Sequence, residues 1–561
     1  MFIPTTKQEL DQLGWQALDV ILVTGDSYVD SPFVGVAVVG HVLIEAGYRV
    51  GIIAQPDVHS RDDIARLGEP RLFWGVSGGC MDSLVANYTA TKKRKRADDL
   101  TSGGRNGRRP NRAVIVYANL IRRYFKRTRP IVLGGVEASL RRIAHYDFWS
   151  DSVRRSILFD AKADVLVYGM AERTVVELAE RLSAGVGIKG LRGICYISPE
   201  RKANAIELPS YEKVAGDKRA FTEMFHTFYR NNDPLTAQGL CQQQDTRYLI
   251  QNPPARYLTQ QELDQVYEMD FERAQHPFYE RLGPVKALET IKFSLATHRG
   301  CYGECNFCSI AVHQGRTVRW RSEGSIVRET RRLAAYPDFK GYIQDVGGPT
   351  ANMYGFECQK KLAKGSCEDR RCVYPQICPQ LKIDHSKQIA LLRRLRKVEG
   401  VKKVFVASGI RYDLVLADRQ HGVSYLREVA RHHVSGQMKV APEHTVGRVL
   451  RLMGKPGTKT LLKFRELFYE LTQAARKKQF LTYYLIAAHP GCTERDMRAL
   501  KRFASRELRI KPEQVQIFTP TPSTYSSLMY HTEMDPFTGK SIFVEKELAQ
   551  KERQKEIVVG G

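Results

Sequence analysis

The sequence has no apolar run of about eighteen residues, the length at which a helix crosses a membrane, so no membrane association is expected. Its first residues, MFIPTTK, lack the basic and then apolar pattern of a secretory signal. We therefore expect a cytoplasmic location, where thiols are kept reduced. Because disulfides are rare in that compartment, the eleven cysteines are expected to be free thiols or metal ligands.

Acidic residues are few relative to basic ones. The 87 lysines and arginines outnumber the 61 aspartates and glutamates, which gives a formal net charge of +26. Basic proteins gain affinity for phosphate backbones by releasing counterions, so RNA is a candidate partner. The alternative is a surface that is merely basic and solvated, and composition does not separate the two.

The 561 residues allow about three or four domains. Residues 1–195 alternate short apolar runs with helical segments, the pattern of an α/β fold with a doubly wound parallel sheet. Residues 92–112 interrupt this domain and combine basic runs with glycine and proline, which favours a mobile loop. That loop either clamps an anionic substrate or is a solvated insertion. The predicted strands are 19–25, 49–54, 72–77, 130–135 and 164–169.

Residues 196–285 are polar and are expected to form a connector that is helical in part. Residues 286–530 contain six strand and helix units, which predicts a second α/β domain. Residues 531–561 form a charged tail, and its last part, residues 546–561, is expected to be disordered. The strands predicted in the second domain are 291–297, 341–346, 403–408, 437–441, 481–487 and 515–518.

A compact cysteine motif follows the strand predicted at 291–297. Cys301, Cys305 and Cys308 have the spacing C-x3-C-x2-C, with the aromatic Phe307 before the last cysteine. Three thiolates on one loop can hold three irons of a four-iron cluster and leave the fourth iron open to a small molecule. A zinc site is the alternative, but zinc sites more often use C-x2-C pairs and need a fourth protein ligand.

A second cysteine set lies in residues 350–384, an insertion after the strand predicted at 341–346. Four cysteines within such a short stretch of a cytoplasmic protein indicate a structural zinc site or an auxiliary iron–sulfur cluster. Their spacing, C-x8-C-x4-C-x5-C, matches no zinc motif closely, and free thiols are the alternative. The four residues are Cys358, Cys367, Cys372 and Cys378.

The first motif resembles the signature of the radical S-adenosylmethionine (SAM) superfamily, C-x3-C-x-aromatic-C. The resemblance implies that Cys301, Cys305 and Cys308 ligate a [4Fe-4S] cluster whose open iron takes the amino and carboxylate groups of SAM. It also implies that Phe307 lies near the adenine, and that residues 286–530 form a partial (β/α)6 barrel. No catalytic residue beyond the cluster is assigned.

The strand ends carry further residues that the superfamily would use for SAM. Gly347 and Gly348 resemble its glycine-rich motif, which holds the amino group of SAM, although Pro349 replaces the usual acid. Ser408 and Arg411 resemble a strand-end motif of methylthiotransferase relatives and would meet the ribose and the carboxylate of SAM.

The order of elements in residues 1–195 looks like the cobalamin-binding or methylthiotransferase-type domains that precede many radical SAM cores. The cobalamin pattern D-x-H-x-x-G is absent, and residues 26–32, DSYVDSP, offer no histidine to a cobalt ion. No bound cobalamin is therefore expected.

Three segments narrow the resemblance to the YgiQ family of radical SAM proteins: residues 345–354, 440–445 and 529–539. This implies an enzyme that cleaves SAM reductively to a 5′-deoxyadenosyl radical, with a flavodoxin or ferredoxin as reductant. The substrate stays open, with RNA and protein as candidates. The alternative is an iron–sulfur protein that senses redox state or iron, or binds RNA, without turnover. The oligomeric state is not indicated.

Overall fold

The computed structural model describes residues 1–560, and within them the chain divides into two units. The first unit holds residues 1–258 and 265–292, and the second holds residues 259–264 and the chain from residue 293 onward. The expected connector, residues 196–285, therefore belongs to the first unit except for residues 259–264. Helix α11 (Gln260–Glu268) spans one of the boundaries.

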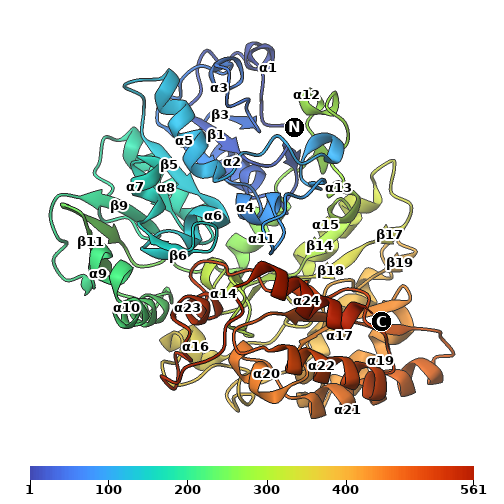
Figure 1. Cartoon of the computed structure of the whole chain (residues 1–561). Coiled ribbons are helices and arrows are strands. Elements are labelled where there is room, and N and C mark those ends of the chain that lie inside the picture. The colour runs from blue at the N-terminus through green and yellow to red at the C-terminus, as the bar shows by residue number, and fades with distance from the viewer. Residues whose placement is uncertain (561) are drawn as a thin grey trace. The chain divides into compact units, whose positions relative to one another are not determined.

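Within the described residues, the first unit is built on a nine-stranded mixed sheet of order β10-β11-β12-β9-β8-β5-β4-β1-β3, drawn blue to green in Figure 1. Strands β3, β1, β4, β5 and β8 are parallel neighbours, and they occupy the five predicted strand positions. The bounds are β1 Val20–Thr24, β3 Val50–Ala54, β4 Phe73–Ser77, β5 Ile131–Gly134, β8 Val165–Val167, β9 Ile194–Ser198, β10 Ile206–Leu208, β11 Leu240–Gln244 and β12 Arg247–Gln251.

Apolar helix faces cover this sheet. Helices α2 and α8 contact each other and bury Val38, Val42 and Leu178 in one core with strand residues such as Val20 and Ile52. The longer helices are α2 Gly35–Glu45, α5 Ala113–Tyr124, α8 Glu172–Ser183 and α10 Lys218–Arg230; the shorter ones include α1 Lys7–Gln12, α4 Ser83–Asn87, α6 Gly135–Leu140, α7 Ile157–Ala161 and α9 Tyr211–Gly216.

Residues 92–112 are not the free loop that their composition predicted. Arg109 from this segment is only 1% exposed. Its Nη2 lies 2.6 Å from Asp26 Oδ1 and 3.1 Å from Asp98 Oδ2, and its Nε donates to the Gly25 carbonyl at 2.9 Å. Gly25 and Asp26 follow β1, where open α/β sheets leave a crevice for ligands. The insertion fills this place at the end of β1 with a buried ion pair of its own.

The second unit joins its strands in parallel ladders. The strand β14 pairs with β18, β17 with β19, β20 with β21 and β21 with β22, and a parallel bridge joins Ile410 to Val440. Each of the six predicted strand positions contains one of these elements. The bounds are β14 Ser294–Ala296, β17 Tyr342–Ile343, β18 Asp345–Gly347, β19 Lys403–Val404, β20 Gln437–Glu443, β21 Phe480–Ala487 and β22 Gln516–Ile517.

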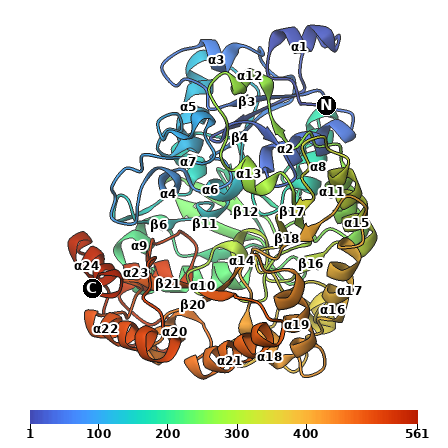
Figure 2. The same ribbon diagram turned by 90° about the vertical axis from the view of Figure 1, so that its right-hand side faces the viewer.

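Helices lie between these strands in the chain, and α18, α19 and α21 contact one another (Figure 2). Their apolar faces and the strands share one core, which includes Leu392, Val429, Phe464 and Met497. The helices are α14 Ile310–His313, α15 Glu323–Ala334, α16 Gln359–Lys364, α17 Ser386–Leu395, α18 Tyr412–Ala417, α19 Gly422–His432, α20 Gly447–Met453, α21 Thr458–Ala474, α22 Glu494–Phe503, α23 Tyr525–Thr532 and α24 Leu548–Val559.

The charged tail, whose last part was expected to be disordered, forms helix α24, which packs on α22, β21 and β22. Lys551 and Gln554 are buried, and they are satisfied by polar groups of the same unit. Lys551 Nζ donates to Tyr530 Oη at 2.7 Å, and the Gln554 side chain accepts from the Ala488 N–H at 3.1 Å. The charged composition of the tail predicted disorder, but the tail contains a helix that packs on the rest of its unit.

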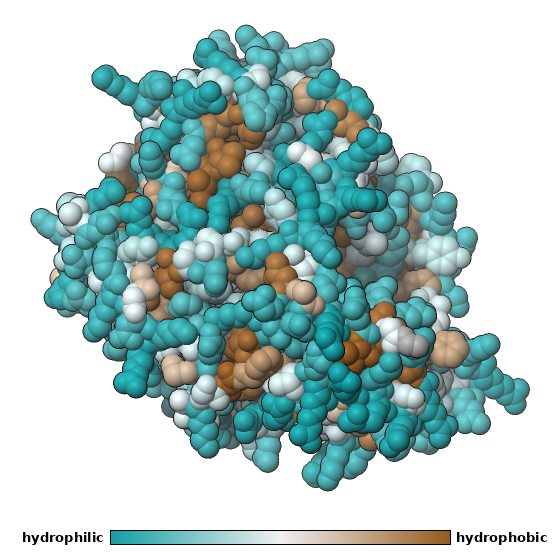
Figure 3. Space-filling model, in the orientation of Figure 1, coloured by the Kyte–Doolittle hydropathy of each residue, from teal (hydrophilic) through white to brown (hydrophobic). Residues whose placement is uncertain are grey.

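The face of the molecule in Figure 3 is mostly hydrophilic, with hydrophobic residues in small separate patches. Among the described residues, no helix combines the length and the apolar character needed to span a membrane.

The Arg109 ion pair gives a stability prediction. Arg109→Met leaves Asp26 and Asp98 buried without their cation, and breaking a buried ion pair in this way costs about 3–5 kcal/mol. We expect the variant to lower the free energy of unfolding by about that amount in a denaturant titration. The exposed neighbour provides the control, because Arg108→Met should stay within about 0.5 kcal/mol of the parent. Equal stability of the two variants would contradict the assigned role of Arg109.

Candidate iron–sulfur site

The cysteine loop follows β14 and the short strand β15 (His298–Arg299), which pairs with β16 (Arg319–Trp320). Backbone hydrogen bonds tie the loop down at both ends. The Cys301 N–H donates to the Gly315 carbonyl at 3.3 Å, and the Asn306 N–H donates to the Met453 carbonyl at 3.0 Å. The loop is therefore held by backbone groups outside it, one of which, Met453, lies far along the chain.

Gly303, inside the loop, marks the point where three polar groups converge. A Cβ atom at this residue would lie 3.2 Å from Cys301 Sγ, 3.7 Å from Cys305 Sγ and 2.7 Å from Arg411 Nη1. The Gly303 N–H also donates to Cys301 Sγ at 3.3 Å. Only a residue without a side chain leaves this space open, so the loop brings two of the predicted thiols together beside a guanidinium.

Cys308 belongs to the same group of thiols. Burial raises the pKa of Cys308 to about 12, and negative charge on Cys305 and Cys301 raises it further. Burial also raises the pKa of Cys301, with charge on Cys305 as the next cause. Both thiols are then protonated at neutral pH until a metal replaces the proton. Three soft sulfur donors on one loop fit an iron–sulfur cluster.

Arg411 is held beside Cys305. Its Nη1 lies 3.8 Å from Cys305 Sγ, and its Nε donates to Asp413 Oδ1 at 3.0 Å. Asn352 fixes the backbone of Arg411 from both sides, because its Oδ1 accepts from the Arg411 N–H at 2.8 Å and its Nδ2 donates to the Arg411 carbonyl at 3.0 Å. The guanidinium therefore places a positive charge next to a predicted cluster ligand.

The predicted glycines lie close to two other elements of the site. A Cβ at Gly347 would lie 3.3 Å from Ser408 Oγ, so these two predicted residues are neighbours. The Ser408 hydroxyl, expected to meet the ribose, donates to Asp345, whose Oδ1 also accepts from the Ser408 N–H at 3.1 Å. A Cβ at Gly348 would lie 2.7 Å from the His298 ring and 2.8 Å from the His298 carbonyl oxygen.

Thr350 links this glycine turn to the cysteine loop, since its Oγ1 lies 3.7 Å from Cys301 Sγ. Sequence reasoning did not single out Thr350, Asp345, Asn352, Asp413 or His298. Asp345 and Asp413 had usable signals, because Asp345 lies near the end of a predicted strand, just before two glycines, and Asp413 is two residues from Arg411. Contacts of Thr350, Asn352 and His298 join distant segments and leave no local pattern.

Phe307 lies against a buried histidine. Its ring is 6.4 Å from the ring of His489, at an interplanar angle of 85°. Burial lowers the pKa of His489 to about 3, so this ring is neutral at physiological pH. Its Nε2 lies 2.7 Å from Ser526 Oγ. The aromatic residue of the motif thus faces a buried and uncharged neighbour.

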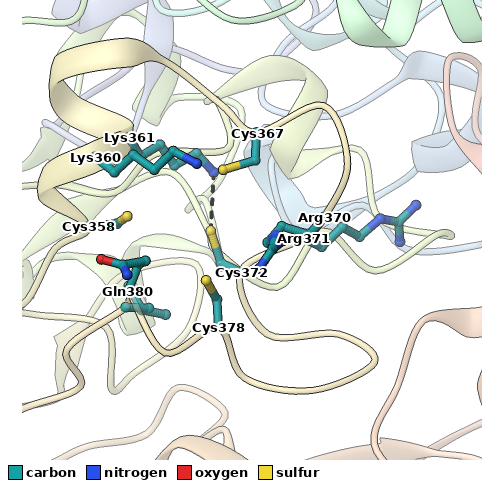
Figure 4. A pocket seen from close by; sticks show the side chains of 10 residues that line it. Cys358, Lys360, Lys361, Cys367, Arg370, Arg371, Cys372, Cys378 and Gln380 are labelled. Atoms are coloured by element: carbon teal, nitrogen blue, oxygen red, sulfur yellow. Dashed lines mark hydrogen bonds between the residues drawn. The ribbon is translucent and has the colours of Figure 1, made fainter.

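The structure also brings the second cysteine set together. Cys358, Cys367, Cys372 and Cys378 line one pocket, and their sulfur atoms face a shared space in Figure 4.

Comparisons with known proteins give a family for the chain, although the family model that matches ends before the cysteine motif. Residues 2–294 match the protein family described as "Radical SAM N-terminal". A UPF0313 protein of Fusobacterium nucleatum is 57% identical over 99% of this chain and 98% of its own length. A UPF0313 protein of Thermotoga maritima is 48% identical over 100% of this chain and 98% of its own length.

Solved structures of radical SAM enzymes share the fold at low sequence identity. The methyltransferase TsrM of Kitasatospora setae, with cobalamin and a [4Fe-4S] cluster bound, matches with a TM-score of 0.52 and 14% identity over 92% of this chain and 78% of its own. The cobalamin-dependent enzyme OxsB matches with a TM-score of 0.50 and 12% identity over 97% of this chain and 56% of its own. The chain is thus a mixed α/β protein, with a sheet rich in parallel strands, that resembles these enzymes in fold.

The close packing of Gly348 gives a prediction for the site. Gly348→Ala places a Cβ against the ring and carbonyl of His298, and His298 immediately precedes the cysteine loop. We expect this variant to retain clearly less iron than the parent after anaerobic reconstitution, measured as iron and sulfide per chain. Gly409→Ala is the matched control, because its Cβ meets nothing within 4 Å and should leave loading unchanged. Full loading of Gly348→Ala would show that the contact with His298 does not position the loop.

Proposed function

The chain belongs to the UPF0313 (YgiQ-like) family, with a radical SAM N-terminal domain, and from this membership we propose that it is a radical SAM enzyme. In this proposal Cys301, Cys305 and Cys308 hold a [4Fe-4S] cluster that leaves one iron for SAM. The observation that carries it is the convergence of the Cys301 and Cys305 sulfurs and the Arg411 guanidinium on the open side of Gly303.

The proposed architecture is a doubly wound N-terminal domain followed by a partial (β/α)6 barrel. The parallel ladders from β14 to β22 support it, because each contains a predicted strand and helices lie between them in the chain. The cysteine loop follows β14 and the short strand β15, and Ser408 follows β19. Such strand ends are where barrel enzymes place their chemistry.

When bound, the cluster and SAM supply a reductive cleavage that gives methionine and a 5′-deoxyadenosyl radical, with the electron drawn from a flavodoxin or ferredoxin. The chain positions and insulates this chemistry. Arg411 offsets the negative charge of the thiolates, since its Nη1 lies 3.8 Å from Cys305 Sγ. Gly347 and Gly348 lack side chains where the turn packs against Ser408 and His298, so the turn can approach these two residues closely.

Ser408 and Arg411 are proposed to bind the ribose and carboxylate of SAM, and Phe307 to lie near the adenine. Ser408 is held by Asp345 and Arg411 by Asp413, so both side chains are ordered before a ligand arrives. Preordered polar groups lose less conformational entropy on binding.

Cobalamin is not part of the proposal. Residues 26–32 contain no histidine, and Arg109 is bonded to Gly25 and Asp26 at the end of β1. The substrate stays open between RNA and protein. The net charge of +26 keeps RNA as a candidate, and binding to it should then weaken steeply with rising salt.

The decisive test is SAM cleavage by the reconstituted protein under anaerobic conditions with dithionite or a flavodoxin system. The parent should release 5′-deoxyadenosine and methionine in equal amounts. Cys305→Ala removes one of three ligands, so release should fall to the level without protein. Cys80→Ala, at an exposed cysteine of the first unit, is the control and should cleave SAM like the parent.

Two results would contradict this proposal in different ways. Undiminished cleavage by Cys305→Ala, with folding verified by circular dichroism, would exclude the ligand assignment. A parent that carries its cluster but releases no 5′-deoxyadenosine under any reductant would instead favour a sensing protein without turnover.

A further inference from the structure

Four cysteines outside the Cys301–Cys308 loop surround one pocket (Figure 4). Cys358 is buried at the start of α16, and Cys367, Cys372 and Cys378 follow that helix on an irregular segment. The Cys378 N–H donates to the Cys372 carbonyl at 2.8 Å and closes a turn that carries both thiols. Four thiols spread over residues 358–378 thus meet in one place, as ligands of a metal centre do.

Basic side chains line the same pocket. Besides the cysteines, its wall includes Lys360, Lys361, Arg370 and Arg371. Lys361 is only 3% exposed, and its Nζ lies 3.5 Å from Cys372 Sγ. Burying an ammonium group is costly unless negative charge faces it. A centre with four thiolates carries net negative charge, so this lining fits a metal bound by all four cysteines.

The spread of the sulfur atoms favours a cluster over a single metal ion. Zinc–sulfur bonds of about 2.3 Å in a tetrahedron bring all four sulfurs within about 4 Å of one another. Among the described residues, only Asp384, Asp418 and His421 bring three metal-ligating atoms within 4.8 Å of one another. In neither cysteine set do three sulfur atoms lie within 4.8 Å of one another. A four-iron cluster takes each thiolate at a different iron and holds the sulfurs farther apart.

We infer that Cys358, Cys367, Cys372 and Cys378 ligate a second iron–sulfur cluster, whose pocket shares a wall with the Cys301–Cys308 loop. With four protein ligands this cluster has no open iron, so it binds no small molecule. The assignment of this second cluster depends only on the four cysteines that line its pocket. Only its effect on the first cluster rests on the proposed function.

Two cations of the second pocket form the shared wall. Arg371 Nη1 donates to the Glu304 carbonyl at 2.9 Å and to Asn306 Oδ1 at 2.7 Å, and both acceptors lie in the first cysteine loop. Lys361 Nζ lies 3.7 Å from Glu304 Oε1. Glu304 is 5% exposed, so its carboxylate is enclosed between the two sites. Filling the second pocket would therefore fix the side chains that support the first loop.

Metal analysis of two cysteine-to-alanine variants tests the assignment. After anaerobic reconstitution with iron and sulfide, the parent should hold about eight iron and about eight sulfide per chain. The variant C301A/C305A/C308A should keep about four of each and cleave no SAM, with the remaining cluster coming from the second set. The variant C358A/C367A/C372A/C378A should also keep about four of each, bound at the first loop. Mössbauer spectra of the parent count the clusters without any variant.

The results separate the two assignments. If C301A/C305A/C308A binds no iron, or binds one zinc ion per chain without sulfide, the second cluster is refuted while the first is untouched. If that variant fails to fold, equal iron in the parent and in C358A/C367A/C372A/C378A refutes the second cluster. Loss of SAM cleavage alone, with both iron counts as expected, bears on the proposed function and leaves the second cluster standing.

The shared wall has a separate test in two neighbouring arginines. Arg371→Met removes the hydrogen bonds to Glu304 and Asn306, whereas Arg370→Met removes a side chain paired with Asp369 on the surface. We expect only Arg371→Met to change the electron paramagnetic resonance spectrum of the reduced cluster in C358A/C367A/C372A/C378A. Identical spectra from both arginine variants would refute the shared wall.

Discussion

The buried guanidinium of Arg411, beside the thiol of Cys305, is the contact on which the first cysteine site depends. Burial alone would raise the pKa of Asp413, but the charge and hydrogen bonds of Arg411 lower it below its ordinary value. The pair therefore stays charged at neutral pH. Asn352 bonds the backbone of Arg411, so the cation keeps its place without help from a ligand. A positive charge held in this way lowers the cost of gathering thiolates on a short loop.

The ends of the parallel strands have different surroundings in the two units. In the first unit, Gly25 and Asp26 after β1 bond to Arg109, so the protein itself occupies a position where many α/β sheets bind a ligand. In the second unit, the corresponding ends carry the cysteine loop, the glycine turn and Ser408. The end of β1 in the first unit is therefore closed by the chain itself, whereas the strand ends of the second unit carry the candidate site.

Much of the fold could be predicted from the sequence, because apolar strands and cysteine spacing are local patterns. All five strand positions predicted in residues 1–195 and all six predicted in residues 286–530 contain strands, whereas strands β9 to β12 of the nine-stranded sheet were not predicted. The sequence did not show that two charged segments, residues 92–112 and the C-terminal tail, pack against the rest of their units. Arg109 and helix α24 looked solvated, yet Arg109 meets acids more than ten residues away and Lys551 meets Tyr530. Likewise, the sequence showed Asp345 and Ser408 only as residues near the ends of two different strands, and their hydrogen bond is visible only in the folded structure.

Glu304 explains how two cysteine-rich sites can lie against each other. Its carboxylate stands between them, and negative charge there would oppose thiolates on both sides. Arg316 Nη1 lies 3.7 Å from Glu304 Oε2, and Lys361 Nζ lies 3.7 Å from Glu304 Oε1, so the carboxylate is neutralised from two directions. Lys361 also reaches Cys372. One buried ammonium group therefore lies beside both sites and places positive charge next to each.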